Sequence, residues 1–282
     1  MRRLWIVSLV LAIALAACRG PAQPAATPAA AAAGAPGLTG KLSVAGSTSV
    51  QPLAEKLAEA FSATNPNLQI DVQGGGSSVG IKSAGEGTVD IGTASRALTD
   101  QDKATYPDLK AFQIARDAIA IVVNNGVAVS DLSPAQVKSI FSGQITNWRE
   151  VGGADAPIVV ICREEGSGTR DAFQSLVMGD ATIVETAILQ SSNGALRTAV
   201  STTPNAIGIL SLGYLDQSLK AVAIGGVQPT AENARSGEYP LVRPFNLLTR
   251  GEPSGLAQAW INWVLSPEGQ KVVTAEHYLP AK

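Results

Sequence analysis

The chain has 282 residues, of which 45% are apolar and 16% are charged. This composition excludes a mainly disordered chain, and the length suits one large domain or two small ones. The 21 basic and 23 acidic residues give a net charge of −2, whereas sequence-independent nucleic-acid binding needs a basic surface. Two cysteines and one histidine exclude a disulfide scaffold and a Cys/His zinc site, and we expect no metal.

The first 17 residues have the proportions of a signal peptide. Arg2 and Arg3 precede an apolar run, residues 4–14, that is too short to span the ~30 Å hydrocarbon core of a membrane. The run ends in Leu15-Ala16-Ala17-Cys18, which resembles a bacterial lipobox. In that family the peptide is cut before the cysteine and the thiol is acylated, so we expect lipidation at Cys18. An ordinary cleavage site with an unmodified cysteine is the alternative.

Residues 18–39 are predicted to be a tether. Positions 21–37 hold nine alanines and four prolines and no charged residue, a composition that cannot build a core. At ~3.1 Å per residue in polyproline II, this stretch would span roughly 50 Å. We therefore expect the folded part at the outer face of the cytoplasmic membrane, or in the periplasm, held by a lipid anchor only. The other cysteine, Cys162, follows the apolar Val159–Ile161 and is predicted to be a buried small hydrophobe rather than a catalytic thiol.

From Lys41 onward, short apolar runs alternate with amphipathic stretches, which predicts an α/β fold with mostly parallel strands. Apolar stripes with helical spacing occupy residues 50–61, 172–177 and 256–264. Gly179 and Ser266-Pro267 are predicted to end the last two. The expected strands are Leu42–Ala45, Leu68–Val72, Val89–Gly92, Ala118–Val123, Ile158–Ile161, Ala206–Leu210, Val222–Ile224 and Leu241–Leu248.

Three predicted strand-to-helix junctions, residues 45–49, 74–78 and 163–169, share the same chemistry. Each combines glycine, which allows close backbone approach, with hydroxyl side chains beside the free N–H groups of a helix start. Helix N-termini attract anions through these donors and through the helix dipole. Ordinary helix capping would explain any single junction. Three of them, one beginning with Arg163, favour a site for a small anion.

A serine hydrolase is the alternative of a different class. Gly76-Ser77-Ser78-Val79-Gly80 matches the G-x-S-x-G pattern of a nucleophile elbow, and His277 follows it in the chain. Only about 35 folded residues precede Ser78, too few for the strands and oxyanion loop that come before the elbow in that fold. His277 also lies five residues from the C-terminus.

Together the junctions resemble the phosphate-binding proteins of bacterial ABC importers, which have a type II periplasmic-binding fold. The resemblance runs from about Lys41 to the end of the chain. Its most specific markers are the stretches 145–148 (Ile-Thr-Asn-Trp) and 163–169. The others are Gly46-Ser47-Thr48, residues 74–78, Val89–Gly92 with Ser95-Arg96, Phe141–Gln144, Pro204–Gly208 and Ser266–Gln270.

The resemblance implies two α/β lobes with mixed, mostly parallel sheets, joined by two hinge strands, 118–123 and 241–248. One lobe would hold residues 40–120 and 245–282, and the other residues 121–244. It further implies a monomeric receptor without enzymatic activity or cofactor. This receptor would bind inorganic phosphate between its lobes and deliver it to the permease of an ABC transporter.

Carried over residue by residue, the resemblance also implies the binding residues. Thr48 and Ser49 would donate a hydroxyl and a helix N–H, and Arg163 would pair with the oxyanion while Glu165 holds the arginine in place. The full expected set is Ser47, Thr48, Ser49, Ser77, Arg96, Arg163, Ser167, Gly168 and Thr169.

Arg96 departs from the pattern of some family members, which have an aspartate there. That aspartate accepts the proton of hydrogen phosphate and so rejects sulfate, whereas Arg96 would add a positive charge. Other members share the Ser-Arg pair. Alternatively, Arg96 is a surface residue paired with Asp100 or Asp102. Sulfate, molybdate or tungstate therefore stay open as ligands, and so does a sensing or adhesion role instead of transport.

Overall fold

The computed structural model of the chain describes residues 37–281. The predicted signal peptide, Cys18 and most of the predicted tether lie outside the described residues. Among the described helices, none has both the length and the apolar character needed to cross a membrane.

The first half of the fold is built on three parallel strands. β1 (Gly40–Gly46) lies between β2 (Leu68–Gln73) and β3 (Ile91–Ala94). The predicted apolar stripe forms helix α1 (Gln51–Ala63), which buries Leu53, Leu57 and Phe61 one turn apart along the same face. The other helices of this half are α2 (Ser77–Glu86), α3 (Asp100–Thr105), α8 (Gly255–Leu265) and α9 (Pro267–Ala275).

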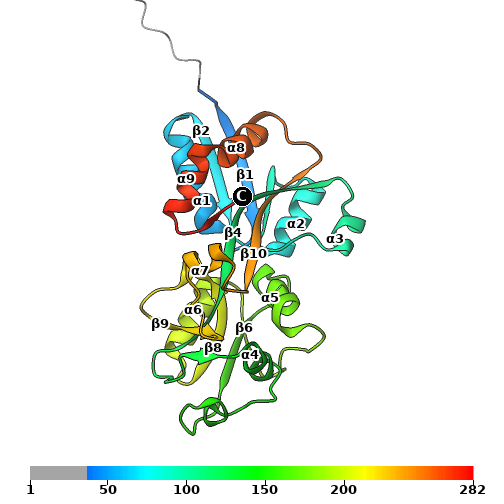
Figure 1. Ribbon diagram of the computed structural model, residues 1–282. Coiled ribbons are helices and arrows are strands. Elements are labelled where there is room, and N and C mark those ends of the chain that lie inside the picture. The colour runs from blue at the N-terminus through cyan, green and yellow to red at the C-terminus, as the bar shows by residue number, and fades with distance from the viewer. Residues whose placement is uncertain (1–36, 282) are drawn as a thin grey trace, which may run out of the picture. The chain divides into compact units, whose positions relative to one another are not determined.

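Two long strands connect this half to the second half (Figure 1). β4 (Leu109–Asn124) pairs antiparallel with β10 (Val242–Arg250) as far as Ala118, which faces Val242. From Ile119 onward β4 pairs instead with β8 (Ala206–Ser211). β4 therefore belongs to the sheets of both halves, and β10 accompanies it up to the crossing point.

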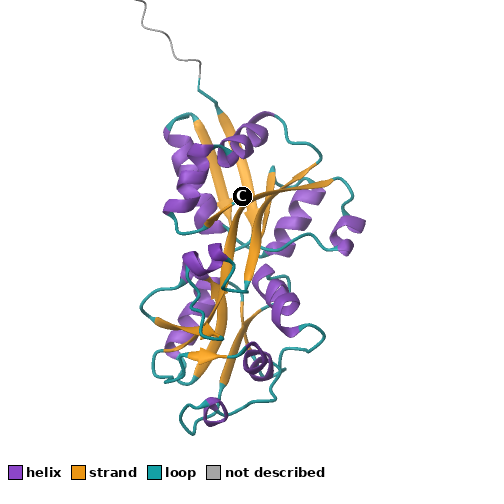
Figure 2. Cartoon of the chain, in the orientation of Figure 1, coloured by secondary structure: helices purple, strands orange, loops and turns teal. Residues whose placement is uncertain are grey.

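The second half repeats the strand-and-helix pattern. β6 (Val159–Arg163) pairs in parallel with β8 and β7 (Ile188–Gln190), while β9 (Leu219–Ile224) pairs with β4. Helices lie on both sides of the strands in each half (Figure 2). The helices of the second half are α4 (Pro134–Phe141), α5 (Gly168–Phe173), α6 (Asn193–Thr202) and α7 (Ala231–Ser236). Shorter helical turns are the 3₁₀ turns Trp148–Val151 and Leu212–Tyr214 and the π-helical turn Gln174–Met178. Two short strands, β5 (Asp131–Leu132) and β11 (Leu279–Pro280), complete the fold.

Each half has its own hydrophobic core. Trp260 and Phe245 are fully buried in the first core, and Phe141 packs against Phe173 in the second with 4.7 Å between ring centroids. Cys162 is fully buried in the second core, and burial raises the pKa of its thiol, so its expected role as a small hydrophobe is confirmed. The predicted lobe boundaries stay a prediction, because the described residues form one compact unit.

The mixed α/β architecture is confirmed, and the helix ends at Gly179 and Ser266 are as predicted. Several strand boundaries were wrong: β1 and β9 begin two and three residues earlier than predicted, and β6 and β10 end two residues later. β3 starts two residues later than predicted, because the Asp90 carboxylate turns back to accept hydrogen bonds from the N–H and hydroxyl of Ser43. β4 starts at Leu109 rather than Ala118, since residues 109–117 mix polar and apolar residues without the strict alternation that indicates a strand. The short strands β5, β7 and β11 were not predicted.

Candidate functional site

The three glycine- and hydroxyl-rich junctions each connect a strand to a helix, as predicted. At the first, the Ser47 hydroxyl accepts hydrogen bonds from the N–H groups of Ser49 (3.2 Å) and Val50 (3.3 Å). Gly46 has φ +140°, and a Cβ there would lie 2.3 Å from the carbonyl oxygen of Thr93. Only glycine therefore allows the chain to enter α1 this close to β3.

The second and third junctions contact each other, although they belong to different halves of the fold. The N–H of Ser78, in the first turn of α2, donates to the carbonyl of Gly166 at 3.1 Å. A Cβ on Gly168 would lie 2.2 Å from the hydroxyl oxygen of Ser77 and 2.6 Å from that of Ser95. Glycine at position 168 is thus required for the starts of α2 and α5 to meet.

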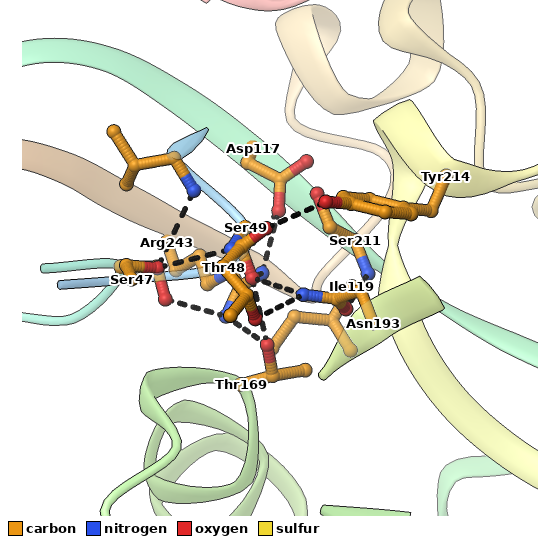
Figure 3. Close-up of polar contacts among 12 residues, drawn as sticks. Ser47, Thr48, Ser49, Asp117, Ile119, Thr169, Asn193, Ser211, Tyr214 and Arg243 are labelled. Carbon is orange, nitrogen blue, oxygen red and sulfur yellow. Dashed lines mark hydrogen bonds and ion pairs between the residues drawn. The ribbon is translucent and has the colours of Figure 1, made fainter. Parts of the chain in front are cut away.

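A buried cluster of polar side chains lies where the first and third junctions meet (Figure 3). The hydroxyls of Ser49 and Thr169 are hydrogen-bonded at 3.0 Å, 120 positions apart in the chain. The amide nitrogen of Asn193 donates to the hydroxyls of Ser49 (2.8 Å) and Thr48 (3.3 Å), and the Tyr214 hydroxyl donates to the carbonyl of Thr48 (2.8 Å). We call Thr48, Ser49, Thr169 and Asn193 the hydroxyl cluster.

Arg243, on β10, is the cation that lies against this cluster (Figure 3). Its side chain is 1% exposed. Nη1 donates to the hydroxyls of Thr169 (2.8 Å) and Ser95 (3.2 Å), and Nη2 donates to that of Ser49 (3.0 Å). The guanidinium therefore contacts residues from both halves of the fold at once.

Asp117 holds this guanidinium from the other side. Its Oδ2 accepts from Nε (3.0 Å) and Nη2 (2.9 Å) of Arg243, and the two residues face each other directly across β4 and β10. Oδ1 of Asp117 has no hydrogen-bond partner among the described residues. Burial raises the pKa of the Asp117 carboxyl, and the attraction of Arg243 offsets only part of that rise.

Arg163 ends β6 and is also buried. Its Nε and Nη2 donate to the backbone carbonyls of Gln190 (3.0 Å) and Ser191 (2.8 Å). Burial, and secondly repulsion from Arg243, lower the pKa of Arg163 to about 10, so it stays protonated at neutral pH. The expected partner Glu165 is exposed, and no hydrogen bond or ion pair joins it to Arg163 among the described residues.

Arg96 turns toward carboxylates instead of the hydroxyl cluster. Nη1 and Nη2 bind Asp102, as the alternative interpretation expected, and Nε donates to Asp171 of α5 at 2.8 Å. Only 9% of the residue is exposed, so it is not a surface arginine. The two carboxylates outweigh burial and raise the pKa of the guanidinium.

The structure thus brings most of the expected residues together. Thr48, Ser49 and Thr169 are in the hydroxyl cluster. Ser77 is linked to it through Ser95, with 3.3 Å between the two hydroxyls, and then through Arg243. The hydroxyls of Ser47 and Ser167 accept from helix N–H groups. The assignment of all nine expected residues as binding residues stays a prediction.

The residues proposed for a hydrolase are not paired. Ser78 lies in the first turn of α2 and His277 follows α9, both are exposed, and no hydrogen bond connects them within residues 37–281.

Arg243, Asp117 and Asn193 were missed in the sequence. Each predicted crossing strand carries a charged residue that could have served as a signal. Asp117 comes just before the strand 118–123, and Arg243 lies inside the strand 241–248. Buried charges are rare unless they are paired, so two opposite charges at these positions could have been matched.

Comparison with known proteins gives consistent matches. Residues 26–268 match the model of a PBP superfamily domain. The chain is 35% identical to the phosphate-binding protein PstS of Bacillus subtilis, over 94% of this chain and 89% of that protein. A phosphate ABC transporter substrate-binding protein from Clostridium perfringens, crystallised with phosphate, is 41% identical with a TM-score of 0.83, covering 86% of this chain and all of that one. An ABC-type phosphate transport receptor from Vibrio cholerae is 35% identical with a TM-score of 0.70, covering 84% of this chain and 99% of that one.

Proposed function

Because the chain belongs to the phosphate-binding proteins of the PBP superfamily, we propose that it captures inorganic phosphate and delivers it to an ABC-type importer. The observation that carries the proposal is the convergence of three strand-to-helix junctions on buried hydroxyls and a buried guanidinium. Such a set binds a tetrahedral oxyanion through short, directed, charge-assisted hydrogen bonds.

The binding residues in this proposal are the hydroxyls and N–H groups of the junctions. Thr48 and Ser49 act from the start of α1, and Ser77 acts from the start of α2. Arg163, Ser167, Gly168 and Thr169 act from the loop and helix after β6. Because these groups come from both halves of the fold, only a closed form engages all of them.

Closure is proposed to occur by bending at the crossing of β4 and β10, between the lobes expected from the sequence. The change of partner strand between Ala118 and Ile119 supports a hinge there, because it is where β4 leaves one sheet for the other. The receptor acts without a catalytic step or cofactor. Its closed form docks on the permease.

We also propose that the chain is a monomer held at the outer face of the membrane by a lipid on Cys18. Replacing Cys18 by alanine is expected to release the protein from the membrane fraction of cells, and unchanged sedimentation with membranes contradicts the anchor. Cys162→Ala is the matched control, because that thiol is buried in the folded part and is expected to leave membrane association unchanged.

The test of function is a calorimetric titration of the chain from Gly37 onward, freed of ligand by unfolding and refolding. We expect phosphate to bind at one site. If none of the tested oxyanions gives a heat of binding, the proposal is overturned. Repeating it in excess sulfate, molybdate or tungstate identifies the ligand, because Arg96 occupies the position of the aspartate that rejects sulfate in some relatives. If sulfate binds tightly and phosphate binds weakly, sulfate replaces phosphate as the proposed ligand.

A further inference from the structure

We propose that Arg243, positioned by Asp117, is a ligand-binding residue of this site and supplies a cation that the family resemblance did not assign. The inference rests on the proposed function and adds to the site a charge placed on a crossing strand. It starts from the hydrogen bonds that the guanidinium makes to three hydroxyl groups, in addition to its ion pair with Asp117.

The hydrogen bonds of Arg243 turn the hydroxyl cluster into a set of donors. A hydroxyl can donate one hydrogen bond and accept two. Ser49 accepts from Arg243 and from Asn193, so it donates its own proton to Thr169. Thr169 then accepts from both Ser49 and Arg243, and its proton is left for a further acceptor. An oxyanion oxygen without a proton is an acceptor of this kind.

The other two buried arginines have less exchangeable partners. Arg96 is held by Asp102 and Asp171, two carboxylates that a ligand anion would have to displace. Two nitrogens of Arg163 bind backbone carbonyls, which cannot turn away. Apart from Asp117, the partners of Arg243 are small hydroxyl side chains that can rotate, so Nη1 and one N–H of Nη2 can transfer their hydrogen bonds to an anion.

Asp117 is a positioning residue for this fork. Its Oδ2 accepts hydrogen bonds from Nε and from one N–H of Nη2. These two bonds fix the plane of the guanidinium so that Nη1 and the other N–H of Nη2 face the hydroxyl cluster. The pairing of the two residues across neighbouring strands sets the same geometry through the backbone.

The test uses the double variant Arg243→Gln/Asp117→Asn, which removes both charges together and leaves neither of the two residues as an unpaired buried ion. Circular dichroism and thermal melting check that it folds. We expect its affinity for the oxyanion that the wild-type chain binds to fall at least 100-fold. Arg250→Gln, on the exposed end of the same strand, is the control and is expected to bind like the wild type. A folded double variant whose affinity stays within threefold of the wild type overturns the inference while the proposed function stands.

If the wild-type chain binds no tetrahedral oxyanion, the proposed function and this inference both fail. If it binds one and only the double-variant result goes against expectation, the inference alone fails. The role of Asp117 is read from Asp117→Asn alone, at a temperature where that variant is folded. We expect at least a tenfold loss of affinity and a shifted NMR signal of the Arg243 Nε–H group. Unchanged affinity in the folded variant overturns the positioning role, because a purely structural contact would lower only its stability.

Discussion

The Nε of Arg96 donates to Oδ2 of Asp171 at 2.8 Å, and this ion pair links the end of β3 in one half to α5 in the other. On its other side, Arg96 binds Asp102 of α3, within its own half. If the halves separate, Asp102 stays with Arg96 while Asp171 moves away. If closure occurs as proposed, the pair with Asp171 belongs to the closed form alone, and it should oppose opening.

The first prediction concerns ligand release. Asp171→Asn removes the charge that holds Arg96 across the two halves, so phosphate should dissociate faster. The pair is partly exposed and worth about 0–1 kcal/mol, so the increase should be up to about fivefold in a stopped-flow experiment. Asp155→Asn, which breaks the exposed pair with Arg149 within one half, is the control. Equal rates in both variants would contradict a closing contact.

The second prediction concerns acid stability. Burial would raise the pKa of Asp102, but hydrogen bonds from Arg96 and Thr99 outweigh burial and hold that pKa below its ordinary value. A carboxyl group with a depressed folded pKa contributes stability above its unfolded pKa of about 3.9, and this contribution is lost as the pH falls through the folded pKa.

Urea unfolding at a series of pH values below about 5 should therefore show a steeper loss of stability in the wild type than in Asp102→Asn. The exposed Asp100→Asn on the same helix is the control and should follow the wild-type slope. Parallel curves for wild type and Asp102→Asn would argue against this contribution.

The third prediction concerns the contact between α2 and α5. In Gly168→Ala the new Cβ would overlap the hydroxyls of Ser77 and Ser95, so the two helix starts must move apart. We expect phosphate affinity to fall at least tenfold with the fold retained, measured by calorimetry and circular dichroism. In Gly37→Ala the new Cβ would have ordinary contacts, the nearest at 3.7 Å, and binding should not change. Tight binding by Gly168→Ala would mean that the close approach is not required.

The fourth prediction concerns the buried ion pair. Asp117→Asn leaves Arg243 buried with its charge uncompensated, which typically costs about 3–5 kcal/mol of unfolding free energy. The double variant Arg243→Gln/Asp117→Asn should lose less, because it buries no unpaired charge. Urea denaturation measures both, and the exposed Asp216→Asn should be near the wild type. A single variant more stable than the double variant would contradict this account.

The parts of the fold that were predictable are those with a strong local signal. The stripe of α1, the glycine-rich junctions and the helix stops at Gly179 and Ser266 depend on neighbouring residues, and all were found. The short strands β5, β7 and β11 carry two or three residues each, too few for a period to be recognised.

The site divides in the same way. Ser49 and Thr169 were predicted because each lies beside a helix start in its own junction. Asp117 and Arg243 are 126 positions apart, and only the pairing of β4 with β10 brings them into contact. Arg96 was expected at the ligand, but its partner Asp171 comes from the opposite half, which no local pattern reveals.

The position of Arg243 and Asp117 on the crossing strands has a consequence for the order of events during capture. Strands at a hinge rotate least when two bodies swing apart, so this charge pair would keep its place whether the molecule is open or shut. An arriving anion would then first contact the Arg243 guanidinium, whose position does not change. Only afterwards would it form the hydrogen bonds with the hydroxyl cluster that depend on its shape. Attraction and selection would be separate steps, with the first independent of closure and the second dependent on it.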